Sequence, residues 1–239
     1  MSIEVRNLIK KFDDRTVIND ISFKVDDGEV LAIVGFSGSG KSTVLKLICG
    51  LIPFDNGEVI TSEGDIAMVF QYSALFDSLN VFDNISFALR ERKDLRKKYT
   101  EKDLKDIVSQ KLQLVGLQGI ENKFPSELSG GMQKRVSFAR AIVTKPNTIL
   151  YDEPTAGLDP MSSTLIEDYI VRLKHEINAA SIVVTHQMST ITRTADRVIM
   201  LYDGKIVFEG TPTELLRQDN PYTKQFVTAS LDGPMKMQA

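Results

Sequence analysis

Several features are scarce in this 239-residue sequence, and each scarcity excludes a class of protein. There is no tryptophan and only one cysteine, Cys49, so the chain cannot contain an internal disulfide, as is typical of a reducing compartment. No apolar run approaches the length of a membrane-spanning helix, and residues 1–12 contain no apolar signal segment. We therefore expect a protein of the cytosol or of the cytosolic face of a membrane, with Cys49 buried as a small apolar residue.

Positive charge is also not in excess. The 29 lysines and arginines face 32 acidic residues, which gives a formal net charge of −3. A global positive field is therefore absent, and we expect no nucleic-acid partner. The apolar fraction of 42% is ordinary for a globular chain, and the length suffices for one large α/β domain or two small ones.

A glycine-rich segment lies between two apolar segments near the N-terminus. The apolar residues 30–34 have the length and β-branching of a buried strand, and residues 44–48 have the spacing of a helix with one buried face. The pattern between them is G-x-x-x-x-G-K-[ST], in the strand–loop–helix context that a phosphate-binding loop requires. Its residues are Gly35, Phe36, Ser37, Gly38, Ser39, Gly40, Lys41, Ser42 and Thr43.

Each residue type in this loop suits a triphosphate. Glycines let successive backbone N–H groups point inward, and the N-terminus of the following helix adds a positive end to the same cradle. Lys41 supplies a positive charge, and the hydroxyl of Ser42 is a ligand for Mg²⁺. The alternative is a glycine-rich turn before an ordinary helix, but the flanking strand favours a nucleoside-triphosphate site.

The segments on either side of this loop predict two kinds of sheet. Residues 3–5 and 21–25 alternate between apolar and polar, which predicts a small antiparallel sheet beside the main one, and a further strand is expected at 58–60. Continuous apolar runs at 66–70, 148–151, 182–184 and 198–201 predict buried parallel strands, and Asp203-Gly204 predicts a hairpin into 206–208. Phe12 is equally compatible with stacking on a nucleotide base and with core packing.

The distance between the strand ending at Gln71 and the next buried strand is far longer than a normal crossover. We therefore expect an inserted helical subdomain over about 72–145, with apolar helix faces at 81–89 and 104–115. The charge run at 90–98 is compatible with a solvated helix surface, with a partner contact or with a contact to anionic headgroups.

Two carboxylates follow the strand at 148–151. Because ligands gather at the carboxyl ends of parallel strands, Asp152 and Glu153 are expected beside the phosphate loop. Asp152 would hold Mg²⁺ directly or through water, and Glu153 would orient or deprotonate an attacking water. A solvated acidic turn is the alternative.

A second anion-receiving helix start is expected at Ser129, followed by Gly130 and Gly131. One chain does not need two γ-phosphate cradles for one nucleotide. We therefore expect this second cradle to serve the nucleotide of another copy, as a two-fold dimer would allow.

Taken together, these motifs resemble the ATP-binding subunits of ABC transporters over nearly the whole chain. The resemblance rests on the phosphate loop, Gln71, the run Leu128-Ser129-Gly130-Gly131, Asp152-Glu153, the run 156–159 and Thr185-His186, in that order. It implies an α/β fold with a P-loop NTPase (RecA-like) core, an antiparallel β subdomain and an inserted α-helical subdomain. It also implies ATP and Mg²⁺ as cofactors and a domain over 1–227 followed by a tail at 228–239.

The resemblance implies roles for the matching residues as well. Phe12 would stack on adenine with Val17 nearby, and Gln71 would sense Mg²⁺ and the attacking water and link to the membrane subunit. Ser129, Gly130 and Gly131 would close on the nucleotide of the partner copy. Asp159 would bridge the dimer and His186 would contact the γ-phosphate, whereas His175 is expected only to be solvated. Met132 departs from the pattern, which usually has Gln there, and its side chain lacks the amide that Gln would supply.

A narrower likeness, over residues 70–85, 88–91 and 130–135 and near the C-terminus, is to the ATPases of Mla/Mce-type lipid transporters, with Ser73 in place of their usual Gly. It implies a peripheral motor on the cytoplasmic side of the bacterial inner membrane, with an integral permease and an Mce-type lipid-binding protein as partners. Leu75, Phe76 and Phe82 are candidates for the permease contact or for the subdomain core. The rival within the family is the ATPase of a small-solute importer. An ATP clamp on DNA or ribosomes and a P-loop kinase explain fewer of the motifs.

Overall fold

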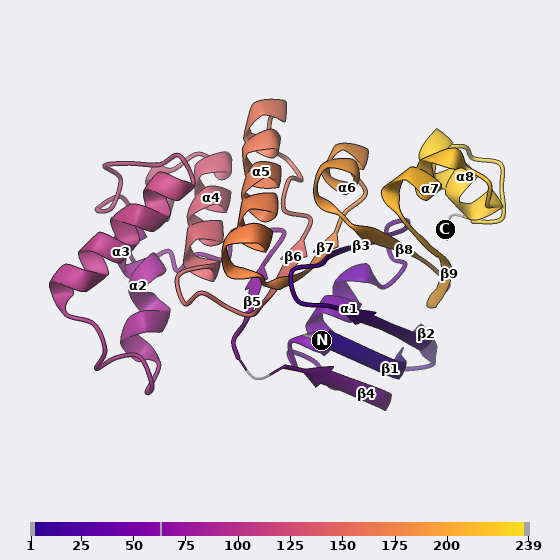
Figure 1. Ribbon diagram of the computed structural model, residues 1–239, viewed down its shortest axis with the longest axis horizontal. Coiled ribbons are helices and arrows are strands. Elements are labelled where there is room, and N and C mark those ends of the chain that lie inside the picture. The colour runs from indigo at the N-terminus through magenta and orange to yellow at the C-terminus, as the bar shows by residue number, and fades with distance from the viewer. Residues whose placement is uncertain (1–2, 63, 237–239) are drawn as a thin grey trace.

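The computed structural model describes residues 3–62 and 64–236, which form a large mixed sheet, a smaller antiparallel sheet and surrounding helices (Figure 1). Within these residues the large sheet has six strands in the order β5-β6-β7-β3-β8-β9. The strands are β3 (Val30–Val34), β5 (Ile66–Val69), β6 (Thr148–Asp152), β7 (Ala180–Val184), β8 (Arg197–Tyr202) and β9 (Lys205–Gly210).

All neighbours in this sheet are parallel except β8 and β9, which pair as an antiparallel hairpin. The hairpin turn at Asp203 and Gly204 has positive φ at both residues, 49° and 73°, as the sequence predicts for a two-residue turn. Every residue of β3, β6 and β7 is buried, because helices cover both faces of the sheet. The continuous apolar runs therefore predicted the parallel strands correctly, although the edge strand β5 is mostly half-buried rather than buried.

The smaller sheet has the order β2-β1-β4, from β1 (Ile3–Phe12), β2 (Arg15–Val25) and β4 (Asn56–Thr61). All its pairings are antiparallel, as expected from the alternating residues. β1 and β2 are longer than the alternation suggests, because the register shifts between Val5 and Leu8 interrupt the alternation without ending the strands. Helix α1 (Lys41–Ile48) buries Val44 and Leu45 in a core shared by both sheets.

The helices between β5 and β6 form one end of the molecule (Figure 1). They are α2 (Val81–Glu91), α3 (Glu101–Leu114), the short 3₁₀ helix η1 (Pro125–Glu127) and α4 (Gly130–Ala141). The side chains of Asn80, Thr100 and Ser129 cap α2, α3 and α4, each by accepting a backbone N–H from the first turn. The apolar faces predicted for α2 and α3 are buried in a common core with β6.

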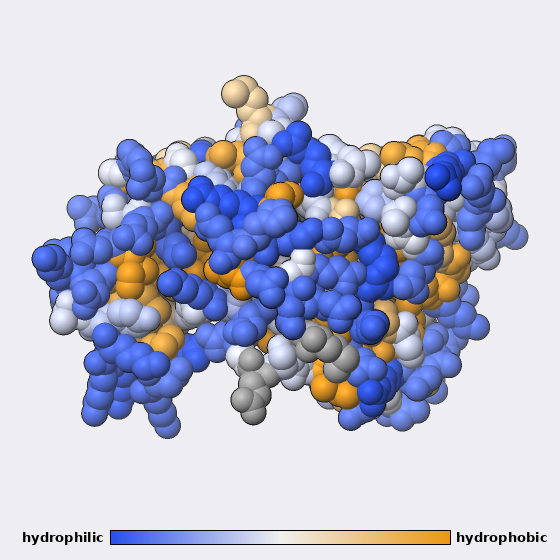
Figure 2. Space-filling view, viewed as in Figure 1, coloured by the Kyte–Doolittle hydropathy of each residue, from blue (hydrophilic) through white to orange (hydrophobic). Residues whose placement is uncertain are grey.

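Most of the charge run at 90–98 lies outside a helix, so it is not the solvated helix surface that the sequence allowed. Helix α2 ends at Glu91, and turns follow until α3 begins at Glu101. This α2–α3 connection lies at the lower left of Figure 1, where Figure 2 shows a strongly hydrophilic projection.

The remaining helices are α5 (Pro160–Ile177), α6 (Met188–Thr194), α7 (Pro212–Arg217) and α8 (Pro221–Thr228). After α8 the described residues of the tail contain neither helix nor strand, yet they fold back onto the domain. Met235 is 2% exposed and belongs to the same buried cluster as residues of β3 and β8. The buried side chain of Gln225 fixes it, since its amide donates to the Met235 carbonyl (2.8 Å) and accepts from the Met235 N–H (2.7 Å).

Replacing Gln225 by alanine is expected to lower the free energy of unfolding by about 1–3 kcal/mol, because both backbone groups of Met235 lose their buried partner. Urea unfolding would measure the change, with the exposed Gln110 replaced by alanine as the matched control. Equal stability of the two variants would show that the tail contributes nothing to the fold.

Three smaller expectations have mixed outcomes. No helix in residues 3–62 or 64–236 combines the length and the apolar character needed to cross a bilayer. His175 is exposed on α5, as predicted. Cys49, expected to be buried, is only half-buried, because it follows the last residue of α1 at the edge of the core.

Candidate functional site

The loop between β3 and α1 has the backbone of an anion cradle. Gly35, Gly38 and Gly40 have φ of 146°, 79° and 97°, in the region that only glycine enters without strain. A Cβ on Gly35 would lie 2.4 Å from the carbonyl oxygen of Leu201, so no side chain fits there. Gly40 is the N-cap residue of α1 and makes no side-chain cap, and the first turn contains no acidic residue. The N–H groups of that turn are therefore left for a ligand.

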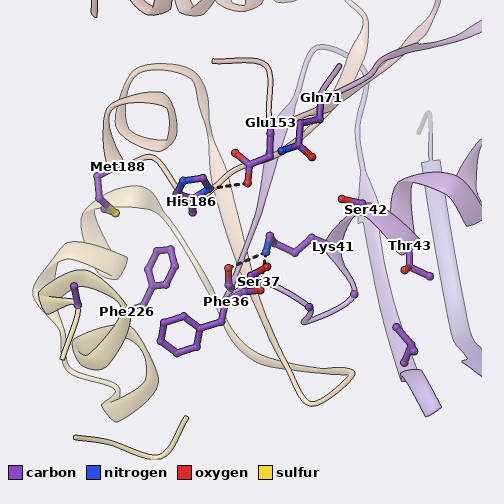
Figure 3. A pocket seen from close by; sticks show the side chains of 15 residues that line it. Phe36, Ser37, Lys41, Ser42, Thr43, Gln71, Glu153, His186, Met188 and Phe226 are labelled. Carbon is purple, nitrogen blue, oxygen red and sulfur yellow. Dashed lines mark hydrogen bonds and ion pairs between the residues drawn. The ribbon is translucent and has the colours of Figure 1, made fainter. Parts of the chain in front are cut away.

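Lys41 lies within this cradle and is 8% exposed. Its ammonium group donates to the carbonyl oxygens of Gly35 (2.9 Å) and Phe36 (2.8 Å), so the side chain curls back over the loop (Figure 3). Desolvation by burial lowers the pKa of Lys41, an effect opposed by the charges of Glu153 and Asp152. Lys41 therefore carries a positive charge that forms no ion pair with a carboxylate in the part of the chain that the structure describes.

Asp152, the last residue of β6, meets the start of α1 from the other side. Its carboxylate accepts a hydrogen bond of 2.8 Å from the hydroxyl of Ser42. Burial raises the pKa of Asp152, the Ser42 hydrogen bond opposes that shift, and the Glu153 charge adds to it. This converging hydroxyl and carboxylate fit Mg²⁺, which prefers oxygen ligands and takes the rest of its shell from water and phosphate.

No group of three or more His, Cys, Asp or Glu side chains in the described residues could hold a metal ion by itself. A magnesium ion that binds together with a nucleotide does not need such a group, because phosphate oxygens and water complete its octahedron. The donor set of Ser42 and Asp152 is therefore adequate for Mg²⁺ with a nucleotide.

Glu153 follows in a left-handed conformation with φ of 48°, which is unusual for a residue with a side chain. Its backbone N–H still bonds to the carbonyl of Val184 (2.9 Å), so the strand pairing continues while the side chain turns into the cavity. One carboxylate oxygen, Oε1, lies 2.8 Å from Nδ1 of His186. The other, Oε2, is buried and has no hydrogen-bond partner in the described structure. Such an orphaned acceptor needs a ligand or a water.

The phosphate loop, Glu153 and His186 line one cavity of about 570 Å³ (Figure 3). It contains most of the residues that the sequence predicted for the site, namely Val17, Gly35, Ser37, Gly38, Gly40, Lys41, Ser42, Thr43, Gln71, Glu153 and His186. Gln71, Glu153 and His186 follow β5, β6 and β7, so the prediction that ligands gather at the carboxyl ends of the strands is consistent with the structure.

The cavity also has an apolar wall that sequence reasoning missed. Phe36, Met188, Phe226 and Ala229 complete the lining, and the rings of Phe36 and Phe226 meet edge to face with centroids 6.4 Å apart. Phe36 belongs to the phosphate loop and Phe226 to α8. Only the fold brings α8 to this loop, and no local pattern in the sequence signals that contact.

The other predicted site residues lie outside the cavity. They are Phe12, Ser39, Asp152, Ser129, Gly130, Gly131 and Asp159. Phe12 is 45% exposed at the end of β1, with the Lys10 ammonium 5.1 Å from its ring centre, so it is not part of the core. Ser39 lines a smaller neighbouring cavity with Val17, and Asp152 reaches the site through Ser42.

The predicted second cradle is open to solvent. Ser129 caps α4, accepting the N–H of Met132 at 3.3 Å, and both Ser129 and Gly130 are exposed. Met132 is half-buried and packs against the core of the helical subdomain. Asp159 is exposed and caps α5 through the N–H groups of Met161 and Ser162. Hydrogen bonds from Ser162 hold the pKa of Asp159 below its usual range.

A second cavity, of about 590 Å³, lies between the edge strand β5 and helices α2 and α4. Its lining includes Phe76, Phe87, Ala88, Arg92 and Arg140. Phe76 is 43% exposed and stacks at a tilt on Phe87, with ring centroids 4.8 Å apart. Of the three candidate contact residues, Leu75 and Phe82 instead pack partly buried against the subdomain core.

Comparison with known proteins agrees with this geometry. The family model described as ABC transporter matches residues 18–156. The chain belongs to the ABC transporter family. Over 98% of its length it is 43% identical to Protein TRIGALACTOSYLDIACYLGLYCEROL 3, chloroplastic, of Arabidopsis thaliana, covering 75% of that protein. Over the same share it is 38% identical to the intermembrane phospholipid transport system ATP-binding protein MlaF of Haemophilus influenzae, covering 93% of it.

The fold agrees as well. A solved dimer of the ATP-binding cassette MJ0796 in a post-hydrolysis state, bound to ADP and Pi, matches with a TM-score of 0.80 and 28% identity. The match covers 88% of this chain and 98% of the cassette. The predicted fold class, a P-loop NTPase with an antiparallel β subdomain and a helical subdomain, is therefore confirmed. As a member of this family, the chain is an ATPase that uses ATP with Mg²⁺.

Proposed function

We propose that this ATPase is the motor subunit of a bacterial transporter that moves phospholipids or related lipids between membranes. The observation that carries the proposal is the cavity in which the phosphate loop, Glu153 and His186 converge. The lipid cargo is supported by the identity to the phospholipid-transport ATP-binding protein over nearly the whole chain. Cassettes of this family dimerise and act with a membrane permease. An Mce-type lipid-binding protein is proposed as the third component, and the cytoplasmic side of the inner membrane as the location.

Binding of the triphosphate is proposed to rest on the loop N–H groups and on Lys41. The ammonium group would exchange its two carbonyl partners, at Gly35 and Phe36, for phosphate oxygens, which are stronger acceptors. Ser42 and Asp152 would hold Mg²⁺, which supplies positive charge against the phosphates when bound. Phe12 and Val17 are proposed to face the adenine.

Hydrolysis is proposed to depend on Glu153 as the general base. Its unpartnered Oε2 would accept the proton of the attacking water, while His186 holds Oε1 at 2.8 Å and so fixes the direction of the carboxylate. Gln71, exposed at the rim of the same cavity, would help to position that water. Ser42, Asp152 and Lys41 then act on the phosphates and Glu153 acts on the water.

The dimer is proposed to complete the pocket. Ser129, Gly130 and Gly131 do not line the cavity of their own chain, yet they present an open helix N-terminus that suits a phosphate. Two copies facing head to tail would place each such helix over the nucleotide of the other copy, with Asp159 at the junction. Because ATP would bind the closed dimer better than the open one, closure could do work on the permease.

The permease is proposed to dock in the second cavity, between β5, α2 and α4, which is lined by Phe76 and Phe87 and is called the docking groove below. Phe76→Asp is expected to reduce recovery of the permease with the ATPase by at least about tenfold, because a buried unpaired charge opposes docking. ATP binding by the isolated variant should be unchanged. Phe124→Asp is the matched control, since Phe124 is 42% exposed and lies outside this groove. If Phe76→Asp unfolds the chain, Phe76 belongs to the core and the assignment is wrong.

The cargo is tested by purifying the native complex and identifying its subunits and bound lipids. A permease, an Mce-type protein and phospholipid are the expected components. A solute-binding protein without lipid would instead favour the alternative, the ATPase of a small-solute importer.

A further inference from the structure

The α2–α3 connection carries a concentration of positive charge that the proposed ATPase mechanism does not use. Residues 91–98 contain five basic and two acidic side chains, in a chain whose net charge is −3. Lys93, Arg96, Lys97 and Lys98 are all exposed, and none of them forms an ion pair with a residue that the structure describes. We call these four residues the basic turn.

Ion pairs and backbone hydrogen bonds fix the conformation of the basic turn. Arg92 binds the carboxylates of Asp65, before β5, and of Asp94, within the turn. Backbone hydrogen bonds from Leu95 and Arg96 to the Arg92 carbonyl close the turn, at 3.0 and 2.9 Å. Leu95 packs against the core of the helical subdomain. Arg92 thus pairs with both carboxylates and holds the turn, while the four other cations project into solvent from a fixed scaffold.

The basic turn adjoins the groove proposed for the permease. Arg92 lines that groove together with Phe87 and Ala88, which lie on the preceding turns of α2. A subunit that docks a membrane protein in this groove must turn the same side toward the bilayer. This step rests on the proposed function, because it takes the occupant of the groove to be the permease.

The chemistry of the basic turn favours a lipid surface over a protein or a nucleic acid. Its apolar neighbours Leu95 and Tyr99 are half-buried in the subdomain core, so the turn offers no apolar anchor for a protein partner. Within the described part of the chain, the basic turn itself contains no aromatic ring for stacking on bases, and the exposed rings of Phe76 and Phe87 belong to the adjoining groove. Attraction to an anionic bilayer needs neither, because clustered Lys and Arg side chains interact with headgroups through charge alone.

We propose that the basic turn binds the anionic headgroups of the membrane beside the permease. It would orient the helical subdomain against the bilayer as a second, electrostatic contact, in addition to the docking groove. Each such cation is expected to strengthen binding to an anionic surface about fivefold, and salt should weaken that binding.

The test compares the full chain with a variant in which Lys93, Arg96, Lys97 and Lys98 are all replaced by glutamine. Co-sedimentation is measured with vesicles of phosphatidylcholine alone and with added phosphatidylglycerol. The native chain should bind only the anionic vesicles, and the variant, which lacks four cations of about fivefold each, should bind them on the order of 600-fold more weakly. The control replaces four other exposed cations, Lys24, Lys205, Arg217 and Lys224, by glutamine and should bind like the native chain. Equal losses in both variants, or none, would overturn the proposal.

A second measurement separates this inference from the proposed function. The variant of the basic turn should still co-purify with the permease, whereas Phe76→Asp should not. If the variant of the basic turn loses the permease but keeps its vesicle binding, the turn contacts protein and the lipid assignment is wrong. If Phe76→Asp keeps the permease while the vesicle result holds, the docking groove is wrong and the lipid contact stands.

Discussion

Replacing Glu153 by glutamine is expected to slow ATP hydrolysis by about 10²–10⁴-fold while ATP binding is retained. The amide has the size of the carboxylate and can keep the contact with His186, but it cannot accept the proton of an attacking water. The left-handed backbone at Glu153 is as accessible to glutamine as to glutamate, so the fold should not change. In rate terms the loss corresponds to about 3–5 kcal/mol of transition-state stabilisation.

The same substitution should make the closed dimer visible. If hydrolysis releases the two copies, a chain that binds ATP without cleaving it accumulates as a dimer in the presence of Mg²⁺. Phosphate release and size-exclusion chromatography with ATP measure the two effects. Glu176→Gln is the control, because Glu176 is an exposed carboxylate on α5 whose one ion pair among residues 3–62 and 64–236 is with Arg172. Undiminished turnover by the Glu153 variant would refute the assigned role.

The part of this molecule that sequence alone predicts is the part governed by local rules. A buried parallel strand is apolar along most of its length, so β3, β6 and β7 stand out without any knowledge of their neighbours. The phosphate loop is equally local, since its glycines and Lys41 lie within seven residues of one another, between Gly35 and Lys41. Strand ends then bring Glu153 and His186 together by a general rule of α/β sheets.

What sequence could not predict depends on contacts between distant segments. Phe226 reaches Phe36 only because α8 packs beside the phosphate loop, and Met235 is buried only because Gln225 binds its backbone. The spacing of Leu75, Phe76 and Phe82 did not separate core from surface. In the structure Phe76 is the exposed member, because its backbone is fixed by the buried side chain of Asn84. Such non-local hydrogen bonds leave no periodic signature in the sequence.

Gly130→Asp is expected to slow hydrolysis by the assembled dimer about 10²–10³-fold, which is the cost of losing donors that stabilise developing negative charge. In the single chain a Cβ at Gly130 meets no atom within 4 Å, so the substitution has room and the monomer should fold normally. The loss would therefore arise from whatever approaches this helix start in the dimer. Gln118→Asp adds the same charge at another exposed position of the helical subdomain and should have little effect.

Mixing two defective chains decides whether the pocket is shared. A dimer of one Gly130→Asp chain and one Glu153→Gln chain has an intact site wherever the first chain's Glu153 faces the second chain's Gly130. Neither variant alone contains such a site, so phosphate release should rise on mixing if the helix start at Ser129 acts across the dimer. If each chain instead closed on its own nucleotide, every site in the mixture would carry a defect. Hydrolysis would then stay at the level of the separate variants.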